Sequence, residues 1–176
     1  RGDIGNTSAM YARAVFDKLG ADAVTLQPYL GKSALQPFLD YKNKGCIVLC
    51  RTSNPDAGEF QDHGKESGKP LWQKVAEHVR DSWNGNKNCL LVVGATHPDE
   101  MRAIREIVGD VPFLIPGIGK QGGDVVAAVR AGMDSNKQGM IINSSSEILY
   151  ASGGKDFAQA ARTKAEELHN AINAAR

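Results

Sequence analysis

The segment of residues 116–124, Pro-Gly-Ile-Gly-Lys-Gln-Gly-Gly-Asp, contains residue types that can hold an anion. Its glycines, among them Gly119 and Gly122, permit positive φ angles and a close approach of the backbone, so that N–H groups can surround a phosphate. Gln121 can donate and accept hydrogen bonds, which suits a bridge between a phosphate and a polar ring. A plain turn starting at Pro116 could carry the same glycines, and the segment is neither a Walker loop nor a dinucleotide fingerprint. The spacing leaves both interpretations open.

Two further polar junctions follow apolar runs. Ser144, Ser145 and Ser146 offer three hydroxyl groups that could bind phosphate oxygens or simply cap the short turn before Ile148. Ser53 lies in the junction Thr-Ser-Asn-Pro of residues 52–55. Asp3 precedes a helical pattern in which Thr7 resembles a cap, and its structural role would be a charge that favours the helix dipole.

Histidine and cysteine give no sign of a metal site or a nucleophile. The four histidines form no ligand pattern, and no acid pair, Cys–His pair or Ser-His-Asp order is evident. Cys46 and Cys50 lie in one strand-like run, where residues four apart are about 13 Å apart at ~3.3 Å per residue. With Cys89 they make an odd count in apolar stretches, which favours buried, reduced thiols in a cytosolic protein.

Strand-like and helix-like segments alternate along the chain and must position these junctions. Short apolar runs predict strands over residues 23–27, 46–50, 89–94, 112–115 and 139–143. Helical patterns cover residues 7–19, 33–41, 70–83, 98–108, 124–131 and 156–175. Residues 54–69 form an extra polar loop, which we expect to be functional or mobile.

This alternation is typical of an α/β domain, either an open doubly wound sheet or a closed barrel. In both, ligands gather beyond the carboxyl ends of the strands, where the junctions lie. A barrel would require about three further strands before Arg1. In (β/α)8 barrels the loops after strands seven and eight commonly build a phosphate site, which would suit the glycine-rich and serine junctions.

The positive and negative charges of the chain are nearly balanced. Lys and Arg number 21 and Asp and Glu 20, for a net charge of +1, which gives no electrostatic case for nucleic acid or an anionic membrane. No apolar run approaches the roughly 18 residues that span a bilayer, and no signal-peptide pattern is present. We therefore expect a cytoplasmic location.

Taken together, the junctions resemble the orotidine 5′-monophosphate decarboxylase family, in its longer, bacterial-type subfamily. The opening residues 1–7, Arg-Gly-Asp-Ile-Gly-Asn-Thr, resemble the end of the family signature Asp-x-Lys-x-x-Asp-Ile/x-x-Thr. The runs at residues 21–31, 50–55, 92–96 and 116–124 follow in the family's order, so the resemblance covers essentially the whole chain. It implies that residues 1–176 are the C-terminal two-thirds of a single (β/α)8 TIM barrel, with roughly the last five βα units.

The resemblance also implies an activity. The family converts orotidine 5′-monophosphate to UMP in pyrimidine biosynthesis, as a homodimer and without a metal or cofactor. An alternating array of Asp and Lys side chains destabilises the substrate carboxylate and stabilises a carbanion at C6 of the pyrimidine, which the Lys then protonates. Binding of the remote phosphate drives much of the catalysis.

Residue roles follow by position in the motifs. Asp3 matches the second signature Asp, which is catalytic and reaches into the partner subunit's site, with Ile4 and Thr7 beside it at the substrate. Ser53 matches the contact to the pyrimidine amide. The closing phosphate loop corresponds to residues 116–123, with Gln121 between phosphate and base. The resemblance further predicts substrate contacts from the residues Pro116, Gly119, Gly122, Ser145 and Ser146.

The sequence departs from the family pattern in two ways. The signature Lys and first Asp would fall just before Arg1, so we expect this chain alone to be inactive, with the missing part either removed or present as a separate N-terminal fragment. The family usually has an Arg where this sequence has Ser146, and that Arg pairs with the phosphate. We therefore expect a weakened phosphate affinity unless another cation, such as Lys120, substitutes.

Two alternatives remain at this point. The first is another phosphosugar enzyme of the same barrel superfamily, which would need Mg²⁺ and an acidic ligand set that the junctions lack. The second is a non-catalytic relative that binds a nucleotide or phosphate, which Ser146 and the missing Lys would favour.

Overall fold

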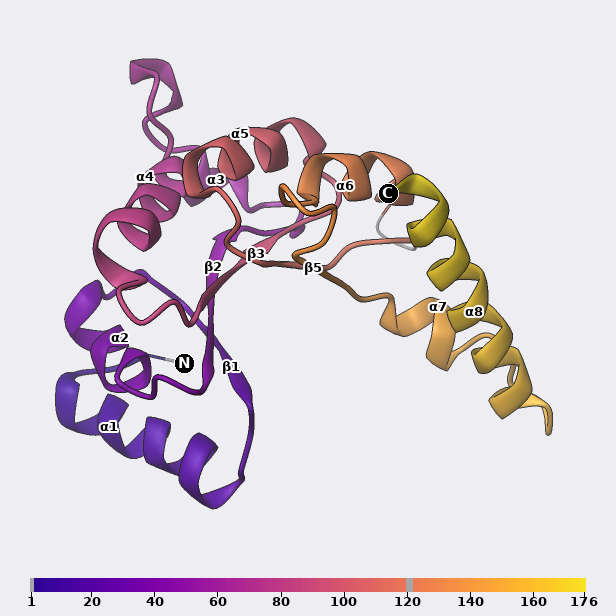
Figure 1. The fold of residues 1–176 in the computed structure, drawn as a ribbon, viewed down its shortest axis with the longest axis horizontal. Helices are drawn as coiled ribbons and strands as arrows, with labels where there is room; N and C mark the ends of the chain where they lie inside the picture. The colour runs from indigo at the N-terminus through magenta and orange to yellow at the C-terminus, as the bar shows by residue number, and fades with distance from the viewer. Residues whose placement is uncertain (1, 120–121) are drawn as a thin grey trace. The chain divides into compact units, whose positions relative to one another are not determined.

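The computed structural model describes residues 2–119 and 122–176, which form two compact units, Arg1–Val92 and Val93–Arg176. Five strands, hydrogen-bonded in the order β1-β2-β3-β4-β5, form a parallel sheet, and a helix follows each strand (Figure 1). The predicted α/β alternation is therefore confirmed.

The first unit contains two βα units after an opening helix. Its elements are α1 (Gly5–Arg13) with a π-helical extension (Ala14–Lys18), β1 (Ala23–Leu26), α2 (Lys32–Leu39), β2 (Gly45–Arg51), α3 (Gly58–Gln61), a 3₁₀ turn (Lys65–Ser67), and α4 (Leu71–His78) with a second π-helical extension (Val79–Trp83). The strand β3 (Cys89–Val93) follows, and its last residue, Val93, is the first residue of the second unit.

The core of the first unit lies between the strands and their helices. Alternate residues of β2, namely Cys46, Val48 and Cys50, are buried. Leu26 of β1 is fully buried, as is Phe38 of α2. Burial of such side chains contributes roughly 1.5–3 kcal/mol each.

The second unit continues the alternation. Its elements are α5 (Pro98–Val108), β4 (Phe113–Ile115), α6 (Val125–Gly132), β5 (Met140–Ile142), α7 (Ser145–Leu149) and α8 (Phe157–Ala175). The helix α5 begins with Pro98 and two acidic residues, as its sequence predicts. The guanidinium of Arg105 lies 3.7 Å from the ring centroid of Phe113 and donates to the carbonyls of Gly109, Val111 and Gly132, which ties the ends of α5 and α6 together.

Two local predictions need correction. The helix α1 begins at Gly5 with Ile4 at its N-cap position, so Thr7 lies inside the helix and is not a cap. Its start is ordered instead by Asp3, whose carboxylate accepts the Ile4 N–H at 2.7 Å, and by the Ser8 hydroxyl, which donates to the Asp3 carbonyl at 2.9 Å. The polar loop of residues 54–69 contains α3 and the 3₁₀ turn, because Gly64 and Gly68 adopt left-handed conformations that bound short turns.

The three cysteines are free and buried, as the sequence predicts. Burial raises the pKa of the Cys46 thiol to about 12 and that of Cys89 to about 11, and it raises the pKa of Cys50 as well. A raised pKa leaves almost no thiolate at neutral pH. Within the described residues, no helix is long and apolar enough to cross a bilayer.

We expect these thiols to resist alkylation in the folded protein. The protein is treated briefly with iodoacetamide at pH 8, with and without guanidinium, and the peptides that contain Cys46, Cys50 and Cys89 are compared by mass spectrometry. Labelling should be negligible in the native sample and near complete in the denatured one. Rapid native labelling of any of the three would contradict the burial described here.

Candidate functional site

The glycine-rich and serine junctions of the second unit meet around a pocket of about 140 Å³. The junctions follow β4 and β5, which are neighbouring parallel strands with Ile115 opposite Ile142. The residues that line the pocket are Pro116, Gly117, Ile118, Asn143, Ser144, Ser145, Ser146 and Glu147. Two segments that the sequence singled out separately therefore lie side by side, at the carboxyl ends of their strands.

The glycine-rich loop is closed on itself by backbone contacts. Gly117, Gly119 and Gly122 have φ angles of 96°, 79° and 85°, a region that L side chains rarely adopt. The N–H of Gly122 donates to the Gly119 carbonyl at 2.6 Å, and the N–H of Gly123 donates to the Gly117 carbonyl at 3.1 Å. The next residue, Asp124, caps α6 by accepting the Ala127 N–H at 2.8 Å. Lys120 and Gln121 lie outside the described residues.

The serine junction forms the first turn of α7. Ser144 is buried at the N-cap position, and its hydroxyl contacts the Glu147 carboxylate at 3.3 Å instead of capping the backbone. Ser145 and Ser146 are exposed and line the pocket. The exposed side chains that could donate to an anion here are the hydroxyls of Ser145 and Ser146 and the amide of Asn143.

Glu147 is a member of the pocket that sequence reasoning missed. Its carboxylate lies against the backbone of Gly119, in the space that a Cβ atom on that glycine would take. A carboxylate beside the loop places negative charge where the sequence predicts a bound anion. Glu147 follows the serine run directly, but no spacing rule shows that a side chain from α7 would reach the preceding junction.

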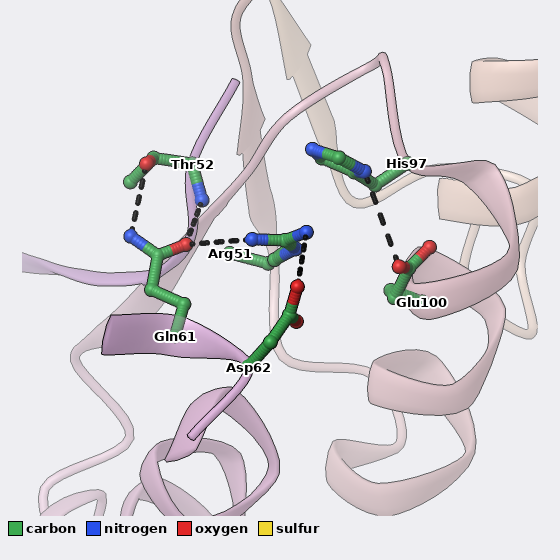
Figure 2. Close-up of polar contacts among 6 residues, drawn as sticks. All are labelled: Arg51, Thr52, Gln61, Asp62, His97 and Glu100. Carbon is green, nitrogen blue, oxygen red and sulfur yellow. Dashed lines mark hydrogen bonds and ion pairs between the residues drawn. The ribbon is translucent and has the colours of Figure 1, made fainter. Parts of the chain in front are cut away.

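In the first unit, Thr52, which precedes Ser53 in the junction, is held by the side chain of Gln61, the last residue of α3 (Figure 2). The amide of Gln61 makes two hydrogen bonds to Thr52, the residue before Ser53. Arg51, the last residue of β2, is 4% exposed and contacts both Gln61 and Asp62. The sequence pattern indicated no role for Arg51, although Arg51 lies in the run of residues 50–55 that resembles the family. It did not indicate Gln61 either, because α3 lies in what was expected to be a loop.

Asp3 also lies at the carboxyl end of a strand. A Cβ atom on Gly2 would lie 2.9 Å from the side-chain nitrogen of Gln27, the residue that follows β1, so the start of the chain runs beside that junction. Since β1 and β2 are parallel neighbours, Asp3 and Ser53 both lie near the carboxyl edge of these strands. Ile4, next to Asp3, is 73% exposed, and Thr7 is half-buried in α1.

Other features of the two units carry less chemistry. In the first unit, an apolar cavity of about 560 Å³ lies between α2, α3 and α4, and neither Asp3 nor Ser53 lines it. In the second unit, His97 Nδ1 lies 4.0 Å from the Glu100 carboxylate at the start of α5 (Figure 2). Among residues 2–119 and 122–176, no group of three or more His, Cys, Asp or Glu side chains could hold a metal ion.

Comparison with known proteins gives a consistent result. Residues 1–163 match the model of the orotidine 5′-phosphate decarboxylase / HUMPS family. The chain is 56% identical over 176 residues to an orotidine 5′-phosphate decarboxylase of Cellvibrio japonicus and 54% identical over 173 residues to one of Janthinobacterium. These alignments include 100% and 98% of this chain, respectively, and the chain spans 64% of the length of each relative.

Solved structures show the same similarity in three dimensions. A UMP synthase structure from Leishmania donovani matches with a TM-score of 0.88 at 40% identity, covering 100% of this chain and 38% of that one. An OMP decarboxylase structure from the same organism matches with a TM-score of 0.83 at 37% identity, covering 98% of this chain and 66% of that one. The five-stranded α/β sheet is therefore part of a TIM barrel of this type, as the resemblance to the family implies.

Proposed function

We propose, because this chain belongs to the orotidine 5′-phosphate decarboxylase / HUMPS family, that its protein decarboxylates orotidine 5′-monophosphate to UMP in pyrimidine biosynthesis. The observation that carries the proposal is the pocket that Pro116, Ser145 and Ser146 line at the carboxyl ends of β4 and β5. A phosphate site in this position is typical of (β/α)8 enzymes.

The reaction breaks the bond between C6 of the pyrimidine and the carboxylate carbon. Carbon dioxide leaves, the electron pair stays on C6, and an ammonium group delivers the proton that completes UMP. The proposed role of Asp3 is to belong to the charge array that crowds the substrate carboxylate and orients the lysine that donates this proton. We assign the proton to a lysine of the family signature, and the proposed chemistry uses no metal or organic cofactor.

The remaining contacts bind and orient the substrate. We assign the pyrimidine amide to Ser53 and the neighbourhood of the ribose to Ile4 and Thr7. The phosphate is assigned to the loop residues Pro116, Gly119, Gln121 and Gly122 and to the hydroxyls of Ser145 and Ser146. Backbone N–H groups of a glycine loop and serine hydroxyls are suitable donors to phosphate oxygens.

The proposal includes a homodimer in the cytoplasm. Ile4 exposes a large apolar side chain beside Asp3, and such exposure is explained if this segment packs against a second copy, whose site Asp3 then enters. Three buried, reduced thiols are in keeping with a reducing compartment.

The test is a turnover assay. We expect the product of the open reading frame that contains residues 1–176 to convert orotidine 5′-monophosphate to UMP, followed by the loss of orotate absorbance, with unchanged rate in EDTA. Asp3→Asn should lower kcat by at least a hundredfold, because general acid–base and electrostatic groups contribute about 10²–10⁴ each.

Two other outcomes would replace the proposal. Binding of UMP without any turnover would indicate a non-catalytic nucleotide-binding relative, which Ser146 and the acidic Glu147 at the pocket would explain. Loss of activity in EDTA would indicate a metal-dependent phosphosugar enzyme.

A further inference from the structure

Arg51 carries a charge that is buried at the end of β2. Only 4% of the residue is exposed, and its partners are the side chains of Gln61 and Asp62, each at 3.4 Å. Its Nε atom is buried and has no hydrogen-bond partner among the described residues. A guanidinium is costly to bury with so few contacts, so its retention there needs a reason.

Gln61 connects this guanidinium to the junction after β2. Its Oε1 atom accepts the backbone N–H of Thr52 at 2.9 Å and also faces Arg51, while its Nε2 atom donates to the Thr52 hydroxyl at 3.0 Å (Figure 2). The amide therefore holds both the backbone and the side chain of Thr52. An unrestrained amide can rotate by 180° and exchange its two ends. The Thr52 N–H and the positive charge on Arg51 both favour the orientation in which the oxygen of Gln61 faces them.

We propose that Arg51 and Gln61 are positioning residues that fix the Thr52–Ser53 junction for binding of the pyrimidine base. Arg51 orients Gln61, Gln61 holds Thr52, and Thr52 fixes the backbone from which Ser53 projects. Asp62 balances the charge of Arg51 through an ion pair in which the arginine side chain is buried and the aspartate side chain is partly exposed. The assignment of the base to Ser53 rests on the proposed function, whereas the restraint on Thr52 does not.

The restraint predicts a local change in backbone protection. In the product of the open reading frame, Gln61→Leu and Arg51→Met should each raise the hydrogen-exchange rate of the Thr52 amide about tenfold or more, as expected when one buried hydrogen bond is lost. Arg51→Lys should behave like Arg51→Met, because a lysine keeps the ion pair with Asp62 but lacks the planar fork that also reaches Gln61.

Two controls separate this effect from general destabilisation. The amide of Val48, in the middle of β2, should exchange as in the wild type in all variants. Gln73→Leu should leave the exchange rate of the Thr52 amide unchanged. Like Gln61, Gln73 is a half-buried glutamine, but its hydrogen bond goes to the Glu77 carboxylate within α4. Faster exchange at both Val48 and Thr52, or an effect of Gln61→Leu that Arg51→Met does not share, would overturn the proposal that Arg51 acts through Gln61.

Ligand affinities test the link to the base. Gln61→Leu and Arg51→Met should each weaken UMP binding and raise KM for orotidine 5′-monophosphate about tenfold, while kcat changes less. Their affinity for ribose 5-phosphate, which lacks a base, should stay unchanged. Equal weakening of UMP and ribose 5-phosphate, or no change in either, would overturn the role in base positioning. If the wild type neither binds UMP nor turns over, the proposed function and the base-positioning role both fail, and the exchange data still decide the restraint on Thr52.

Discussion

Ser146→Arg is expected to lower KM for orotidine 5′-monophosphate by about ten- to a hundredfold, because charge-assisted hydrogen bonds contribute roughly 1.5–3 kcal/mol each. Ser146 is exposed at the pocket of about 140 Å³ that Pro116, Gly117 and Ile118 also line. A guanidinium there could pair with a phosphate through two parallel N–H donors, which a serine hydroxyl cannot do. The measurement is steady-state kinetics of the complete gene product, with calorimetry for UMP.

Glu147 should limit how far Ser146→Arg lowers KM. Its carboxylate lies over Gly119 in the same pocket, where it repels a phosphate and would compete for a new arginine. We therefore expect Glu147→Gln to lower KM by about fivefold on its own, a modest change because the residue is exposed and its charge is screened. The two substitutions together should improve affinity by more than the product of the single effects, since Glu147 no longer pairs with Arg at position 146.

The matched control for charge is Ser146→Met, which adds a long side chain without a positive charge. Its KM should equal or exceed that of the wild type. The same KM for the Met and Arg variants would show that size, and not charge, controls binding. An unchanged KM in Ser146→Arg, alone and with Glu147→Gln, would remove phosphate binding from this pocket.

Gly123→Ala should open the glycine-rich loop and raise KM for orotidine 5′-monophosphate at least tenfold. A Cβ atom on Gly123 would lie 2.6 Å from the Gly117 carbonyl oxygen and 2.7 Å from the Cβ atom of the buried Ala95. Neither the backbone nor the buried side chain leaves room for this added carbon. The Gly123 N–H also donates to that carbonyl, and the contact cannot widen without losing this bond. Overpacking of this kind costs about 1–3 kcal/mol.

Thermal unfolding and kinetics together test this prediction. The melting temperature of Gly123→Ala should fall by several degrees, at about 2–4 °C per kcal/mol for a protein of this size. Gly153→Ala is the matched control, because nothing lies within 4 Å of its Cβ position, and it should change neither property. A Gly123→Ala variant with wild-type KM would mean that closure of the loop is not needed for phosphate binding.

Much of the architecture could be predicted from local sequence patterns. The five apolar runs became the five strands, and Pro98 and Asp124 marked helix starts at or next to the positions expected of them. These predictions succeed because burial on both faces of a parallel strand, and the start of a helix, depend on residues close in the sequence. Thr7 was misassigned as a cap because Asp3 and Ser8 order the start of α1 in its place.

The sequence by itself determined the order of the elements and the polar junctions at the ends of the strands, and the motifs in those junctions identified the family. Tertiary structure alone decided which side chains meet there: that Glu147 covers Gly119, and that Gln61, bonded to Thr52, faces a buried Arg51. The physical reason is that periodicity reports which face of an element is buried, whereas a contact between polar side chains depends on the path of the whole loop between them. Residues ten positions apart in the chain have no spacing rule, so only the folded backbone brings Arg51 to Gln61.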